Sequence, residues 1–277
     1  MPRIAFVGAG NMASSLVGGL LRNGARAADL IAADPDATQR DRLAKARGIV
    51  TTEDNNAAIR SSRVVVLAVK PQVMETVIRH LRLSRDQLLI SIAAGITLDS
   101  LARWGANDLA VVRCMPNTPA LYGAGITAMC ANAHVSAADR ELATAVMSAA
   151  GVTLWVEREE MLDAVTAVSG SGPAYFFYLM EAMIEAARQL GLPDDVARKL
   201  TFETARGAAI MASESAESPA ELRRNVTSKG GTTERALGVL DEAAAKASIV
   251  RAVCAAAERS RELADELGRS GPRGAGA

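Results

Sequence analysis

The sequence predicts an α/β domain built on a doubly wound parallel sheet, followed by an all-helical domain. Through about residue 155, short apolar runs rich in β-branched residues alternate with helical patterns, which is typical of parallel-sheet domains. After about residue 160 no β-rich run recurs, and apolar residues follow a spacing near 3.6 in an alanine-rich background. The domains are therefore expected at residues 1–160 and 161–267, with a disordered tail at residues 268–277.

Strands are expected in the first domain where apolar runs are continuous, because strands covered on both faces of a parallel sheet show no polar alternation. The expected strands are residues 3–7, 30–33, 63–69, 88–92 and 110–113, with later strands at 126–130 and 152–156. Helices are expected between them, at residues 12–23, 36–47, 72–81, 98–104 and 137–150.

The second domain is expected to contain long helices at residues 194–213 and 242–267. Gly191 and Pro193 lie between two helical patterns, where a glycine ends one helix and a proline opens the next. These helices carry more Ala, Met and Leu than a small bundle needs. Part of their surface is therefore expected to form a homodimer interface, although an internal core would give a similar pattern.

Composition argues against several classes of protein. Lys plus Arg and Asp plus Glu both number 31, so the zero net charge predicts no binding to nucleic acid or to an anionic membrane. Three cysteines without a C-x-x-C pair predict a reducing, cytoplasmic location, and with only two histidines no metal site is expected. Residues 4–21 are uncharged, but glycines, serines and an asparagine interrupt them, so we expect no membrane span there.

The strongest local motif is G-A-G-N-M-A, residues 8–13, which follows an expected strand and precedes an expected helix. Gly8 permits a tight turn, Gly10 lets a pyrophosphate approach the backbone, and Ala13 takes the place of a third glycine. The phosphates would bind the free amides at the start of the helix. This motif predicts a Rossmann-like dinucleotide site, with a glycine-rich turn of another α/β fold as the alternative. The residues assigned to it are Gly8, Ala9, Gly10, Asn11 and Met12.

Asp34 lies at the end of the second expected strand, where a carboxylate would bond the adenosine ribose hydroxyls. An acid at that place disfavours a 2′-phosphate, but Arg40 or Arg42 on the next helix would offset its charge. The sequence therefore leaves the choice between NAD(H) and NADP(H) open. The alternative role for Asp34 is to cap the helix that follows it.

Two further turns follow expected strands, on the side of a doubly wound sheet where ligands bind. In the first turn Lys70 is a candidate proton donor or phosphate contact, or else a solvated lysine. In the second turn small residues permit close approach of a ring such as nicotinamide, or else simply pack tightly. The residues of the two turns are Ala68, Val69, Lys70 and Pro71, and Ala93, Ala94 and Gly95.

Three other segments contain unusual local sequence. Two prolines fix M-P-N-T-P-A at residues 115–120, and S-G-S-G-P-A-Y at residues 169–175 suits a capped helix start or a kink. Residues 225–234 bring two glycines and four hydroxyls to the start of a helix near Thr232. That combination predicts a second anion site, suited to a small carboxylate, with a plain helix cap as the alternative.

Together these motifs resemble the pyrroline-5-carboxylate reductase family. The resemblance covers about residues 3–266, and the motifs occur in family order: F-V-G-A-G-N-M, A-V-K-P, S-I-A-A-G, M-P-N-T-P-A, S-G-S-G-P-A-Y and G-G-T-T. It implies an N-terminal Rossmann domain and a C-terminal helical domain that dimerises, often with the dimers assembled into a larger ring. Lys229 departs from the family pattern, in which a proline often precedes the two glycines.

The resemblance also implies roles for individual residues. Cofactor contacts are implied for residues 8–12, 68–71 and 93–95, and for Asn55 and Asn225. A substrate-carboxylate loop is implied at Gly231, Thr232 and Thr233, with Ser171 nearby. The implied reaction is NADH- or NADPH-dependent reduction of the cyclic imine 1-pyrroline-5-carboxylate to L-proline in proline biosynthesis. The imine proton would arrive with the substrate, or through Thr233, Ser171 or a water molecule.

Two other functions fit parts of the sequence. A β-hydroxyacid dehydrogenase shares the glycine motif but uses a catalytic lysine on its helical domain, and neither Lys199 nor Lys229 lies in a matching motif. A catalytically silent dinucleotide sensor needs no second anion site. Both therefore account for less of the sequence than an imine reductase does.

Overall fold

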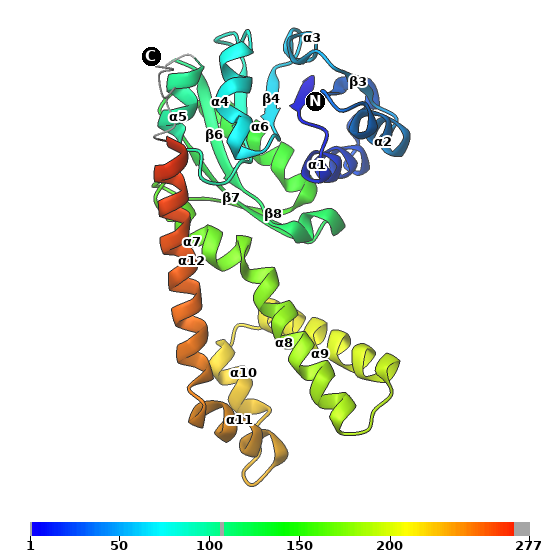
Figure 1. Ribbon diagram of the computed structural model, residues 1–277, viewed down its shortest axis with the longest axis vertical. Coiled ribbons are helices and arrows are strands. Elements are labelled where there is room, and N and C mark those ends of the chain that lie inside the picture. The colour runs from blue at the N-terminus through cyan, green and yellow to red at the C-terminus, as the bar shows by residue number, and fades with distance from the viewer. Residues whose placement is uncertain (1, 106–107, 269–277) are drawn as a thin grey trace, which may run out of the picture. The chain divides into compact units, whose positions relative to one another are not determined.

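The computed structural model describes residues 2–105 and 108–268 (Figure 1). The chain divides into two compact units, one formed by Met1–Ser171 with Ala256–Ala277 and the other by Gly172–Ala255. The last helix, α12 (Ala245–Gly268), contributes residues to both units. The predicted tail, residues 268–277, lies outside the described residues except for Gly268, and the predicted domain boundary at residue 160 stays a prediction.

The first unit contains an eight-stranded, mostly parallel sheet with the strand order β3-β2-β1-β4-β5-β6-β7-β8. Its strands are β1 (Ile4–Val7), β2 (Leu30–Ala33), β3 (Val50–Thr52), β4 (Val64–Leu67), β5 (Leu88–Ser91), β6 (Ala110–Met115), β7 (Gly125–Ala131) and β8 (Gly151–Trp155). β7 runs antiparallel to β6 and parallel to β8, so the last two strands are reversed relative to the others. Only residues 116–124 connect β6 to β7, too few for the crossover that a parallel pair requires.

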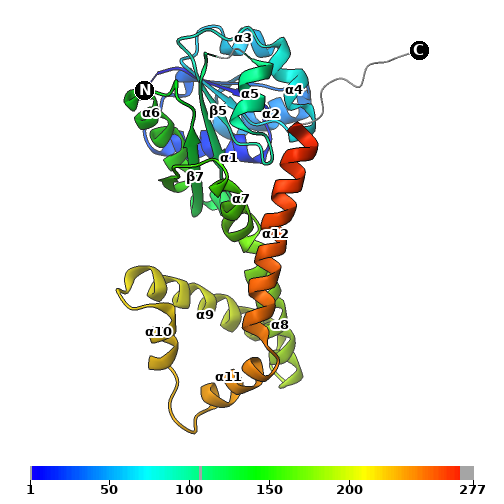
Figure 2. The same ribbon diagram turned by 90° about the vertical axis from the view of Figure 1, so that its left-hand side faces the viewer.

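Helices cover both faces of this sheet (Figures 1 and 2). They are α1 (Asn11–Arg22), α2 (Ala37–Arg47), α3 (Asn55–Ile59), α4 (Pro71–His80), α5 (Leu98–Trp104), α6 (Ala137–Met147) and α7 (Met161–Val165), the last followed by a π-helical turn (Thr166–Gly170). Alternate residues of each central strand enter different cores. In β1, Phe6 packs with α1, α2 and α6, whereas Val7 packs with α3, α4 and α5. This period of two is what a sheet buried on both faces requires.

Helix α1 lies unusually close to the turn that precedes β8. A Cβ atom built at Gly19 would lie 1.8 Å from the carbonyl oxygen of Ala149, so only a glycine fits there. At Gly18 the nearest atom, at 2.6 Å, belongs to the guanidinium of Arg47, the far end of a flexible side chain. The two adjacent glycines of α1 therefore differ. A rigid backbone carbonyl excludes a side chain at Gly19, whereas a movable side chain lies beside Gly18.

We predict that Gly19→Ala lowers the free energy of unfolding by about 1–3 kcal/mol, the usual cost of overpacking a core. Gly18→Ala is the matched control, because Arg47 can move aside and alanine has the better helix propensity. The measurement is denaturant unfolding of both variants followed by circular dichroism. Equal losses in the two variants would contradict the account of rigid contact at Gly19.

An ion pair joins the start of β4 to the start of α6. The carboxylate of Asp139 accepts a hydrogen bond from Arg63 and forms a capping box with Ser136. Burial acts to raise the pKa of Asp139, but hydrogen bonds from the hydroxyl and amide of Ser136, and then Arg63, outweigh it and lower that pKa. The folded protein therefore favours the ionised carboxylate.

A carboxyl whose pKa is lowered by folding stabilises the folded state above the unfolded-state pKa, and that stabilisation is lost as the pH falls through the folded-state value. We therefore expect the stability of the wild type to fall below about pH 4. Asp139→Asn should be less stable at neutral pH and show a shallower loss in acid. Unfolding midpoints measured across that pH range test this, with Asp41→Asn, an exposed acid of α2, as the control.

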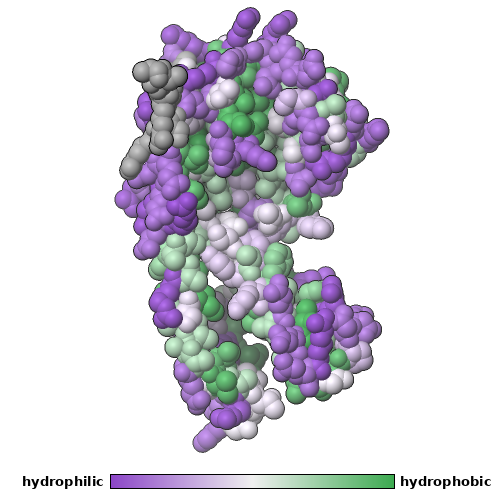
Figure 3. Space-filling view, in the orientation of Figure 1, coloured by the Kyte–Doolittle hydropathy of each residue, from purple (hydrophilic) through white to green (hydrophobic). Residues whose placement is uncertain are grey.

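The second unit consists of α8 (Gly172–Gln189), α9 (Asp194–Glu214), α10 (Pro219–Asn225), α11 (Thr232–Glu242) and the first part of α12. α8 packs against α9, yet many large apolar side chains of this unit are exposed in the protomer. They include Phe176, Phe177, Tyr178, Leu179, Leu200, Phe202, Ile210, Met211, Val239, Leu240, Ile249 and Val250. Apolar surface is visible on these helices in Figure 3. Exposure on this scale is typical of a protein–protein interface.

In the described part of the chain, no helix has the length and hydropathy needed to cross a membrane.

Candidate functional site

The turn between β1 and α1 is pressed against the end of β4. Gly8 has φ +103°, and a Cβ at this position would lie 2.5 Å from the carbonyl oxygen of Ala68. The amide of Ala68 in turn donates to the carbonyl of Val7 at 2.8 Å. Gly8 is therefore required both for the backbone conformation and for the close approach of the two strand ends.

The start of α1 is open. Its N-cap is Gly10, which has no side chain to satisfy the first amides, and the first turn that follows contains no acid. A Cβ at Gly10 would have no described atom within 4 Å, so free space lies over this helix end. The first helical bond is donated by Ser14, which leaves earlier amides directed out of the helix. Such an end binds phosphate through its N–H groups and its dipole.

A pocket of about 560 Å³ lies over this turn. Its lining residues are Gly8, Gly10, Asn11, Asp34, Pro35, Asp36, Gln39, Arg42, Ala68, Val69 and Lys70. The pocket thus brings together the ends of β1, β2 and β4, the side on which doubly wound sheets bind ligands. The amide oxygen of Gln39 is buried and has no hydrogen-bond partner among the described residues. The residues present therefore fit a dinucleotide.

Several predicted cofactor residues lie outside this lining. Ala9 is fully buried, and its amide donates to Asp34; Met12 packs against the core beneath α1. Pro71 begins α4 and Asn55 begins α3. Conversely, Pro35, Asp36 and Gln39 line the pocket without having been predicted. Only their position in the sequence, shortly after the second strand, could have indicated that these three residues line the pocket.

Asp34 does not cap α2, the alternative role considered for it. One of its carboxylate oxygens accepts from the amide of Ala9 at 2.8 Å, and the other accepts from the amide of Asp36 at 2.9 Å. The cap of α2 is Asp36, which accepts from the amide of Thr38 at 2.8 Å. The Asp34 carboxylate is therefore fixed in the wall of the pocket.

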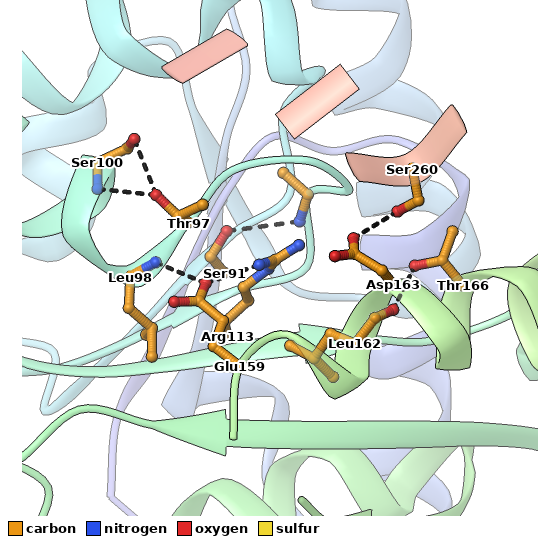
Figure 4. A network of polar contacts seen from close by, with 11 residues as sticks. Ser91, Thr97, Leu98, Ser100, Arg113, Glu159, Leu162, Asp163, Thr166 and Ser260 are labelled. Atoms are coloured by element: carbon orange, nitrogen blue, oxygen red, sulfur yellow. Dashed lines mark hydrogen bonds and ion pairs between the residues drawn. The ribbon is translucent and has the colours of Figure 1, made fainter. Parts of the chain in front are cut away.

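The turn at Ala93–Gly95 packs against the last part of α12. Gly95 has φ +74°, and a Cβ there would lie 3.0 Å from a methyl carbon of Leu267. Figure 4 shows the polar network close to this turn. The buried Arg113 forms an ion pair with Glu159 at 2.6 Å, and the same carboxylate oxygen accepts from the amide of Leu98 at 2.8 Å. At Gly95 the geometry matches tight packing, and a contact with the nicotinamide ring stays a prediction.

The segments at residues 115–120 and 169–171 meet through Asn117. Its side-chain amide donates to the carbonyl of Ser169 at 3.1 Å and accepts from the amide of Ile126 at 2.9 Å. A Cβ at Gly170 would lie 2.7 Å from the terminal methyl of Met115. The buried Asn117 therefore has a structural role, holding the π-helical turn that directly precedes Ser171.

In the second unit, the glycine-threonine segment begins a helix that has no capping side chain at its N-cap. A tight turn is closed by the amide of Gly231 donating to Ser228 at 3.0 Å, with Gly230 at φ +73°. Lys229 occupies the second position of this turn, where a proline is favoured but not required, so the turn forms without one. Gly231 is the N-cap of α11 and, like Gly10, offers no capping side chain.

Two polar groups that were expected to bind ligands, in residues 225–234, already have hydrogen-bond partners within the protein. The carboxylate of Glu234 accepts from the amide of Gly230 at 2.6 Å, so an acid already lies at the start of α11. Asn225 ends α10, and its side-chain amide donates to both carboxylate oxygens of Glu217 at 3.0 Å. Thr233 lies in the second unit and Ser171 in the first.

The titratable side chains offer little chemistry of their own. Burial raises the pKa of the Cys114 thiol, which keeps it protonated and unreactive. Among the described residues, no group of three or more His, Cys, Asp or Glu side chains is placed to hold a metal ion.

The fold and this pocket define a dinucleotide-dependent oxidoreductase of the Rossmann type with a separate helical unit. A family model described as pyrroline-5-carboxylate reductase dimerisation matches residues 159–263, and one described as NADP oxidoreductase, coenzyme F420-dependent, matches residues 3–95. The sequence is 52% identical to pyrroline-5-carboxylate reductase of Pseudomonas aeruginosa over 97% of this chain and 99% of that protein. The chain belongs to the pyrroline-5-carboxylate reductase family, and its dimerisation domain implies a homodimer.

Solved structures agree with this assignment. Pyrroline-5-carboxylate reductase from Coxiella burnetii is 39% identical, covering 95% of this chain and 98% of that one, with a TM-score of 0.89. The crystal structure of Plasmodium falciparum pyrroline carboxylate reductase with NADP bound is 28% identical, with the same coverage and a TM-score of 0.84.

The two glycines of the cofactor turn should respond differently to a methyl group. We predict that Gly10→Ala weakens binding of the dinucleotide by about tenfold or more without loss of stability, because its Cβ would enter only open space over the helix start, where we expect the pyrophosphate. Gly8→Ala should lose both binding and stability. Titration with the reduced cofactor, followed by its fluorescence, and thermal unfolding measure the two effects. Normal affinity in Gly10→Ala would contradict the placement of the pyrophosphate.

Proposed function

We propose that this chain reduces 1-pyrroline-5-carboxylate to L-proline with NADH or NADPH, as a step of proline biosynthesis. The observation that carries the proposal is the open start of α1, with free space over Gly10, in a pocket that joins three strand ends. Membership of the pyrroline-5-carboxylate reductase family supports the choice of imine and product.

Within this proposal, the first unit holds the cofactor. The amides at the start of α1 bind the pyrophosphate, and Asp34 and the residues around it hold the adenosine ribose. Lys70, exposed at the N-cap of α4, lies at the rim of the same pocket and contributes positive charge toward the phosphates. When bound, the nicotinamide supplies the hydride for the imine carbon.

The second unit is assigned to the substrate. The start of α11, with Gly231, Thr232 and Thr233, binds the substrate carboxylate and so fixes the orientation of the imine. Glu234, already bonded to Gly230, acts against a second negative charge here, so the hydroxyls of Thr232 and Thr233 carry more of the binding. The imine nitrogen must gain a proton as its carbon gains the hydride. We assign that proton to the substrate, which would then bind as the iminium, or to the hydroxyl of Thr233, the hydroxyl of Ser171 or a water molecule, each of which would regain a proton from solvent.

The assembly and location are part of the same proposal. The exposed apolar side chains of the helical unit form the homodimer interface, and the dimers assemble further into a ring. Three free cysteines, two of them buried, support a cytoplasmic enzyme.

The division of labour between the units is testable at Thr233. We predict that Thr233→Ala raises KM for the imine or lowers kcat by about tenfold or more, the usual range for losing a hydrogen bond to a charged group. Affinity for the reduced cofactor should be unchanged. Thr233→Ser keeps the hydroxyl and should restore most of the activity.

The assay is oxidation of NADH or NADPH with pyrroline-5-carboxylate as substrate, run in parallel with hydroxy acids and the oxidised cofactors. Turnover of hydroxy acids instead of the imine would indicate a hydroxyacid dehydrogenase, and no turnover with either would indicate a binding protein. A loss of cofactor affinity in Thr233→Ala as large as the loss of turnover would contradict the assigned substrate loop.

A further inference from the structure

The two helix starts at the cofactor pocket differ in charge. α1 begins at a glycine and leaves its amides free, whereas α2 begins at Asp36, whose carboxylate accepts from the amide of Thr38 at 2.8 Å. The amide of Asp36 itself is bonded to Asp34 at 2.9 Å. An anion at the start of α2 would therefore have to displace carboxylates that already neutralise its amides.

Two carboxylates line this part of the pocket. Asp34 and Asp36 contribute carboxylates, which when ionised have only acceptor oxygens. Asp34 cannot turn away from the pocket without breaking its bonds to the amides of Ala9 and Asp36. Acceptors fixed in this way suit the donor hydroxyls of a ribose, and they repel a phosphate, which carries about two negative charges and only acceptor oxygens.

The nearby arginines do not offset these acids equally. One nitrogen of Arg40 donates to the backbone carbonyls of Asp34 and Pro35, at 2.7 and 2.9 Å, and Arg40 is not part of the pocket lining. Arg42 does line the pocket, but its guanidinium donates to the side-chain oxygen of Asn11 at 3.1 Å. Asn11 is the first residue of α1, so this contact directs the charge of Arg42 toward the pyrophosphate turn.

We infer that the β2–α2 turn of this chain selects a free 2′-hydroxyl on the adenosine ribose, so that NADH is preferred to NADPH. The residues that set this preference are Asp34 and Asp36. The inference rests on the proposed function for the identity of the cofactor class, and it deepens that function by naming which member is used. The Plasmodium falciparum relative was solved with NADP bound, so the inference concerns the turn of this chain alone.

The test is the affinity of the full-length protein for NADH and for NADPH in the absence of substrate, measured by cofactor fluorescence and by calorimetry. The two cofactors differ only in the 2′-phosphate, so the ratio of their dissociation constants isolates this turn. We expect NADH to bind more tightly by about tenfold or more, the effect of one unfavourable charge contact in a partly solvated pocket.

Two variants assign the preference to the acids. Asp36→Asn removes one charge and keeps the cap, because asparagine caps helices as well as aspartate does. It should lower the dissociation constant for NADPH by about threefold to tenfold, and adding Asp34→Asn should shift the ratio further toward NADPH. The matched control is Asp41→Asn, which removes an exposed acid of the same helix outside the pocket lining and should leave the ratio unchanged.

Three results would overturn the inference. The first is a wild type that binds NADPH more tightly than NADH. The second is a weaker affinity for NADPH in Arg42→Gln and an unchanged affinity in Lys45→Gln. That result would assign the 2′-phosphate to Arg42. The third is an equal shift in Asp36→Asn and Asp41→Asn, which would reduce the effect to net charge. A protein that binds NADH tightly but leaves the imine unreduced would refute the proposed function and support this inference.

Discussion

The cofactor site depends on one close contact, between the turn after β1 and the end of β4. Gly8 lies against the carbonyl of Ala68 at a distance that no side chain tolerates, and a hydrogen bond from Ala68 to Val7 continues the sheet up to that point. This contact sets where α1 begins, and the position of its first turn decides where the proposed diphosphate site lies. The close approach of Gly19 to Ala149 further along the same helix holds the rest of α1 against the unit. The open helix start is therefore a product of backbone packing, with polar side chains contributing little.

Much of the first unit could be predicted because its signals are local. The run Val64–Leu67 forms β4 within the predicted strand, and α5 spans Leu98–Trp104 as its pattern indicated. β3 was missed because its three residues, V-T-T, carry no apolar run, and the reversal of β7 follows from the length of a connection that periodicity does not report. The glycine turn was predicted from spacing, whereas the bonds of Asp34 to Ala9 and Asp36 could not be, since they depend on how the β2 turn folds back over the helix start.

The second unit shows why composition indicates an interface without giving its structure. An isolated helical unit of this size should bury the apolar faces of its own helices, yet Phe176, Tyr178 and Leu200 are more than half exposed in the protomer. Burial of such side chains is the main favourable term in folding and association alike. A unit that leaves them exposed obtains part of its stability from a second copy of the chain, which agrees with the match of residues 159–263 to a dimerisation model.

Several helix starts of this protein differ in the residue at the N-cap. α1 and α11 begin at Gly10 and Gly231, and these are the two places where the chain is proposed to hold the anionic groups of its ligands. α2, α5 and α6 begin instead at residues whose own side chains accept from the first turn. A helix start capped from within is stable on its own and has little affinity left for an anion, whereas a glycine start costs some stability and leaves the amides for a ligand. Under the proposed function, the glycine at the N-cap of α1 leaves that helix start for phosphate, whereas the aspartate at the N-cap of α2 makes the neighbouring helix start suited to a neutral sugar.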